Sequence, residues 1–76
     1  MVVSVQNMEN EKRKEACAIE TMCYMLREYA IEKNVSFETA MTSFVDSIVY
    51  QTLFDFDTGV WKEGPDYLRH LFDVNS

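Results

Sequence analysis

Apolar residues recur at intervals of three and four over two stretches of the chain, the spacing of one face of an α-helix. In the first stretch these positions are Ile19, Met22, Cys23, Leu26, Tyr29 and Ala30. In the second they are Phe37, Ala40, Met41, Phe44, Val45 and Ile48. Each set predicts an amphipathic helix whose apolar face packs into a core.

The boundary between these two helices is marked by residue types that end and begin helices. Lys33 places a cation in a last turn, and Asn34 tolerates the left-handed conformation that often follows one. Ser36 then offers a hydroxyl as an N-cap, and Glu38 suits the positive end of the second helix. We therefore expect a break near residues 33–36.

Residues 48–54 leave three interpretations open. They could continue the second helix, form a separate short helix capped by Asp46 and Ser47, or form a strand, which lacks an obvious partner; we favour a helix. A loop follows over residues 55–64. Pro65 after Gly64 predicts the first turn of a last helix, whose apolar face consists of Tyr67, Leu68, Leu71 and Phe72.

These elements predict an all-α fold, a small bundle of three to four helices. Residues 1–8 lack helical spacing and are predicted to form a flexible N-terminal arm, and residues 9–76 a single helical domain. A chain of 76 residues buries only about 60% of the surface it exposes when unfolded. Dimerisation could therefore complete its core.

The charge balance restricts the partners of this domain. Thirteen acidic residues against seven basic ones give a net charge of −6, which argues against direct binding to nucleic acid. No apolar run is long enough for a membrane span or a signal peptide. We expect a cytoplasmic protein without a membrane or nucleic-acid ligand.

Catalytic and metal-binding patterns are weak. Cys17 and Cys23 would point about 120° apart on one helix, match no zinc motif, and are interpreted as small, buried or half-buried apolar side chains. His70 stands alone and is interpreted as a surface residue near a helix end. We therefore predict no catalytic residue, no metal and no cofactor, and hence a protein that is not an enzyme.

Alternating aspartates at Asp55 and Asp57 resemble the start of a calcium-binding EF-hand loop. Such a loop needs glycine at its sixth position and glutamate at its twelfth, where this chain has Val60 and Asp66. A turn in which aspartates accept backbone hydrogen bonds explains the pattern better.

The acidic residues gather in the second half of the chain, together with most of the aromatic ones. Residues 38–76 contain seven acids and two bases, a net charge of −5. A small core explains many of these aromatic residues, but loop residues Phe56 and Trp61 are the least accounted for by it. They are the predicted contacts for another protein, expected to be basic, together with Asp55, Asp57 and Tyr67.

The chain from Ala16 to Phe72 resembles a family of short bacterial all-helical proteins, a domain of unknown function often encoded beside toxin-like genes. The likeness rests on Glu28-Tyr29, residues 34–36, Phe44 and the helix start at residues 64–68. The chain departs from the family pattern at Phe37 and at Trp61, where the family has a loop histidine. The resemblance implies an antitoxin-like or accessory role and transfers no functional residue.

Three functional hypotheses follow. The first is a non-catalytic protein–protein interaction module that uses its acidic and aromatic half. The second is a self-associating structural subunit, a homodimer. The third, from charge alone, is an acidic mimic of nucleic acid that occupies the site of a nucleic-acid-binding protein.

Overall fold

The computed structural model describes the backbone of residues 2–75 and the side chains of residues 11–75. Within this part the chain forms α-helices and short 3₁₀ turns and no β-strand. The helices are α1 (Val2–Lys33), α2 (Phe37–Val45), α3 (Ile48–Phe54) and α4 (Pro65–Asn75), and the 3₁₀ turns are η1 (Phe56–Thr58) and η2 (Val60–Lys62). The prediction of a small all-α bundle is confirmed.

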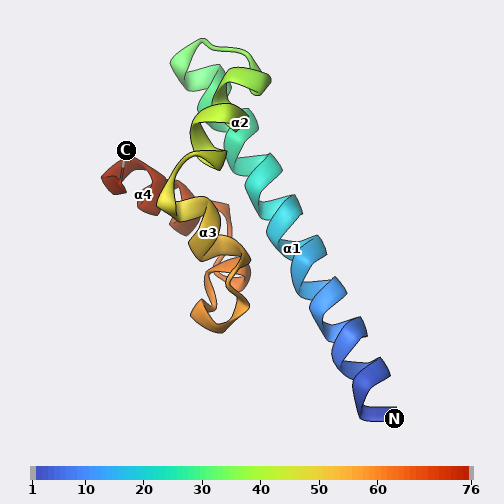
Figure 1. Ribbon diagram of the computed structural model, residues 1–76. Coiled ribbons are helices and arrows are strands. Elements are labelled where there is room, and N and C mark those ends of the chain that lie inside the picture. The colour runs from blue at the N-terminus through green and yellow to red at the C-terminus, as the bar shows by residue number, and fades with distance from the viewer. Residues whose placement is uncertain (1, 76) are drawn as a thin grey trace.

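The bundle is built along one long helix. Helix α1 packs against α4, α2 and η2, and all the other elements gather on one side of it (Figure 1). Its N-terminal end extends beyond them, so that the molecule measures 49 × 20 × 19 Å.

The start of α1 differs from the sequence prediction. The backbone is helical from Val2, whereas residues 1–8 were expected to form an arm without helical spacing. The helix therefore includes residues 2–8 of that arm, and Met1 lies outside the described residues. The mobility of this segment stays a prediction.

The predicted break between α1 and α2 is confirmed. Asn34 adopts a left-handed φ of 57° directly after α1, and the Ser36 hydroxyl accepts a hydrogen bond from the Thr39 backbone N–H at 3.1 Å. This bond satisfies one of the N–H groups that the first turn of a helix leaves free.

A second break separates α2 from α3. The backbone N–H of Asp46 closes α2, and α3 begins at Ile48. Ser47 occupies the N-cap position of α3 without a side-chain capping bond; its hydroxyl instead donates to the Phe44 carbonyl at 2.7 Å. Of the alternatives left open for residues 48–54, the separate helix is the one observed, but the expected cap does not form.

The core lies where the four helices meet. Its most deeply buried large side chains are Met25, Leu26, Phe44, Leu53, Leu68 and Phe72. Phe44 and Phe72 pack edge to face, with ring centroids 5.2 Å apart. The last helix begins at Pro65, as predicted, and contributes Leu68 and Phe72 to this core.

Five residues on the predicted apolar faces are exposed instead: Ile19, Phe37, Val45, Ile48 and Tyr67. The prediction placed Ile48 on the same helical face as Phe37 to Val45. Because α2 ends at Val45 and Ile48 begins α3, the helical spacing no longer relates Ile48 to that face. On α1, the buried face is shifted, because Ala18 and Met25 lie inside it. The helical spacing of apolar residues therefore predicted the helices correctly, but it was partly wrong about which residues are buried.

None of the helices within residues 2–75 is both long enough and apolar enough to cross a membrane.

Candidate functional site

The connection between α3 and α4 forms a tip held together by local hydrogen bonds. The Asp55 carboxylate accepts from the Asp57 backbone N–H at 3.3 Å. The Thr58 hydroxyl lies 2.8 Å from the carbonyl of Asp55 and 2.9 Å from that of Thr52. Gly59 joins the two 3₁₀ turns with a φ of 76°, a conformation that glycine adopts without strain. The Asp55 carboxylate therefore accepts a backbone hydrogen bond within a turn, as the interpretation against an EF-hand loop predicted, whereas Asp57 contributes its backbone N–H.

Trp61 is attached to this tip by both its ring and its N–H group. The indole Nε1–H donates to the Phe56 carbonyl at 3.1 Å, and the two rings meet nearly edge to face with centroids 6.4 Å apart. Both side chains are half-buried against the core. From α1, the Lys14 ammonium stands 5.7 Å from the centroid of the Trp61 ring, within range of a cation–π attraction.

Phe56 and Trp61 therefore have a structural role that the sequence did not reveal. A series of neighbouring ring pairs joins the tip to the centre of the core, in the order Tyr29, Phe72, Phe44, Tyr50, Phe54, Phe56 and Trp61. Because each ring contacts the next, the tip aromatics are held in place before any partner arrives. The sequence ranked these two residues as the least accounted for by the core, and the structure packs both of them against it.

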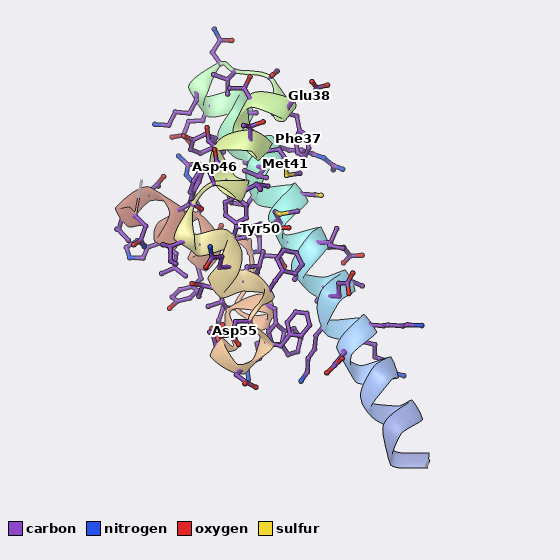
Figure 2. All side chains as sticks on the ribbon, viewed as in Figure 1. Phe37, Glu38, Met41, Asp46, Tyr50 and Asp55 are labelled. Atoms are coloured by element: carbon purple, nitrogen blue, oxygen red, sulfur yellow. The ribbon has the colours of Figure 1, made fainter. Side chains whose placement is uncertain are left out.

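Acidic side chains border these aromatic residues. Asp55, Asp57 and Glu63 are exposed, and none of them forms an ion pair with another described side chain. Figure 2 shows Asp55 on the connection that follows α3, far from Phe37 and Glu38 at the opposite end of the molecule. The tip thus presents three exposed carboxylates beside half-buried rings, and two basic side chains lie close to them, Lys62 of η2 and Lys14 of α1.

The structure brings together four of the five predicted contact residues. Asp55, Phe56, Asp57 and Trp61 share the tip, whereas Tyr67 lies on α4 with 44% of its surface exposed. Among the described residues its ring forms no aromatic pair with Phe56 or Trp61. We define the acidic tip as Asp55, Phe56, Asp57, Trp61 and Glu63; the sequence prediction did not include Glu63.

The strongest electrostatic contacts lie away from this tip, between α1 and α4. Arg69 donates two hydrogen bonds of 2.9 Å to Glu32 and two of 3.0–3.1 Å to Asp73. Its guanidinium also lies 4.9 Å from the centroid of the Tyr29 ring. Hydrogen bonding by Arg69, reinforced by its charge, lowers the pKa of Glu32. The same carboxylates raise the pKa of Arg69, so this group of residues acts as an ionic clamp between two helices.

The remaining reactive side chains form no shared site in the part of the chain that the structure describes. Cys17 is exposed, which contradicts the expectation that it is buried or half-buried, while Cys23 is half-buried, within that expectation. His70 is exposed on α4, in agreement with the surface interpretation. Across residues 11–75 no three His, Cys, Asp or Glu side chains lie close enough together to hold a metal ion.

Two hollows differ in size and position. A cavity of about 90 Å³ lies between α1 and α4, lined by Tyr24, Met25, Glu28, Pro65, Asp66 and Arg69. It is smaller than the several hundred Å³ typical of small-molecule sites. A wider groove of about 520 Å³ lies at the corner between α1 and α2, lined by Arg27, Ala30, Ile31, Asn34, Val35 and Phe37.

Comparison with known proteins adds no relative to this description: no protein-family model, curated protein or solved structure matches the chain.

Proposed function

We propose that this chain is a non-catalytic protein–protein interaction module that binds a basic partner through its acidic tip. The observation that supports this proposal is the combination found there. Exposed carboxylates without ion pairs lie on the same connection as Phe56 and Trp61, whose rings pack against the core.

This combination suits a protein interface for two physical reasons. Aromatic anchors that are already ordered lose little conformational entropy when a partner covers them. Acidic residues around them attract a basic surface and speed its approach. The net charge of −5 over residues 38–76 acts in the same direction.

An antitoxin-like or accessory role in the cytoplasm is the concrete form of this proposal. It depends on the family resemblance carried by the helix-boundary residues, and it predicts that the partner is a single protein bound in a fixed ratio. The alternative hypothesis, an acidic mimic of nucleic acid, predicts that the chain occupies the nucleic-acid site of its partner. Added nucleic acid would then displace the chain from that partner.

The test is affinity capture from native lysate, with three baits compared side by side. The first is the wild-type chain, and the second carries Asp57→Lys with Glu63→Lys. The third carries Glu38→Lys with Asp46→Lys, the same change of charge placed on and after α2, away from the tip (Figure 2). Circular dichroism checks that all three baits fold.

We expect the wild-type bait and the α2 control to retain one basic protein in stoichiometric amount. The tip variant should recover at least tenfold less of this protein. Equal recovery on the tip variant would show that binding does not use the acidic tip. Recovery of the wild-type bait alone would contradict the interaction module itself.

A further inference from the structure

The outward side of α1 carries a regular row of exposed residues. They are Arg13, Ala16, Glu20, Tyr24, Arg27 and Ile31, spaced by three or four. Each residue of a helix advances about 100°, so this row lies nearly opposite the buried face that contains Ala18 and Met22. All other elements pack on the far side of α1 (Figure 1). We name this row the outer face.

The outer face contains two large apolar side chains that are mostly exposed, although Tyr24 also borders the cavity between α1 and α4. Ile31 is 77% exposed and Tyr24 is 56% exposed. The groove of about 520 Å³ continues this face past the end of α1, because Arg27 and Ile31 belong to both. With Val35 and Phe37 in the groove, Ile31 forms a contiguous exposed apolar surface beside charged residues, the kind of surface that serves as a docking site.

The charges on the outer face are self-complementary. Glu20 and Arg27 lie two helical turns apart, both exposed, and neither forms an ion pair among the described side chains. If two α1 helices pack antiparallel about an axis between Cys23 and Tyr24, Glu20 faces the partner's Arg27. The same twofold axis repeats this contact, which yields two ion pairs across one interface.

The same arrangement matches side-chain sizes. Ile31 then lies over the partner's Ala16, so a bulky side chain meets a small one, and the partner's α1 enters the groove. Residues 14–33 of both copies overlap over about 30 Å at 1.5 Å per residue. A parallel arrangement would instead set each Glu20 against the partner's Glu20.

We propose that the outer face binds a second copy of this chain, with the two α1 helices antiparallel. A twofold dimer requires one surface that is complementary to itself, and the outer face meets this requirement in both charge and size. The proposal goes beyond the proposed function, because it uses a different face and leaves the acidic tip of each copy free.

Charge reversal tests this arrangement by sedimentation equilibrium. The wild-type chain is expected to approach twice its mass of 8.9 kDa as its concentration rises. Glu20→Arg and Arg27→Glu each create two like-charge pairs and should weaken the dimer at least tenfold. The double variant Glu20→Arg with Arg27→Glu restores the opposite charges and should dimerise within about threefold of wild type.

Two further samples sharpen the test. The two single variants, mixed in equal amounts, should form a heterodimer, since each supplies the charges that the other lacks. Asp46→Arg and Lys62→Glu are the matched controls, because they make the same charge reversals on exposed residues after α2 and at the end of η2 and should dimerise like wild type. Circular dichroism confirms that every variant keeps its helical content.

A wild-type chain that stays at 8.9 kDa at every concentration would overturn the proposal, as would single variants that dimerise like wild type. Failure of the double variant and of the mixture to dimerise would overturn the antiparallel pairing. These outcomes are separate from the proposed function, because Glu20→Arg should still capture the basic partner through its acidic tip.

Discussion

Replacement of Phe44 tests how the core holds the tip and the helices together. Phe44 is fully buried, and its ring packs edge to face against both Phe72, at 5.2 Å, and Tyr50, at 6.0 Å. Each such aromatic pair contributes about 0.5–1.5 kcal/mol beyond its buried area. Phe44→Leu removes both pairs while it keeps an apolar side chain, so we expect a loss of about 1–3 kcal/mol.

This loss is large for a chain of this size. At about 0.05–0.15 kcal/mol per residue, the free energy of unfolding of 76 residues is about 4–11 kcal/mol. The matched control is Phe37→Leu, the same substitution on α2 at a residue that is 36% exposed and has no ring partner among the described residues. We expect it to cost less than about 0.5 kcal/mol.

Urea unfolding followed by circular dichroism measures both variants. Each substitution is made in the Glu20→Arg background, so that self-association does not contribute to the free energy. We expect the Phe44 variant to lower the unfolding midpoint clearly, with an unchanged slope, and the Phe37 variant to leave it nearly unchanged. Equal midpoints for the two variants would refute the assignment of Phe44 to the centre of the core.

Two other predictions address the boundary of α2 and the ionic clamp. Ser36→Ala removes the bond to the Thr39 N–H and should cost about 1 kcal/mol in urea unfolding, whereas Ser43→Ala, at an exposed position within the same helix, should cost nothing; equal losses would contradict the cap. Because Arg69 lowers the pKa of Glu32 below 4.5, the clamp should stabilise the fold above that pH and lose its effect as the pH falls through the lowered value. Glu32→Gln should therefore reduce the acid dependence of the melting temperature, and an unchanged pH profile would contradict this contribution.

The sequence predicted helices well where single residues carry the information. Asn34 and Ser36 end one helix and begin the next through contacts within a few residues, and Pro65 begins α4 for equally local reasons. Such contacts depend on residue type and not on the rest of the fold, so residue type alone was enough to locate them.

The sequence could not predict which apolar residues are buried where tertiary contacts decide it. Ile48 is exposed where α3 begins after the break at Ser47, and Ala18 is buried on the helix against which α4, α2 and η2 pack. The structural role of Trp61 has the same origin, since its partners Phe56 and Lys14 come from a turn and from a distant helix. The Arg69–Asp73 spacing was a visible signal for half of the ionic clamp, while Glu32, 37 residues away, was not.

The most direct test of the central claim, that the acidic tip contacts a protein partner, uses its tryptophan. Trp61 is the sole tryptophan of the chain, so incorporation of 5-fluorotryptophan gives a ¹⁹F NMR spectrum with one resonance from the tip. Addition of the captured partner is predicted to shift or broaden this resonance in the wild-type chain, but not in the Asp57→Lys, Glu63→Lys variant. A resonance that stays unchanged while the partner is bound would contradict the claim.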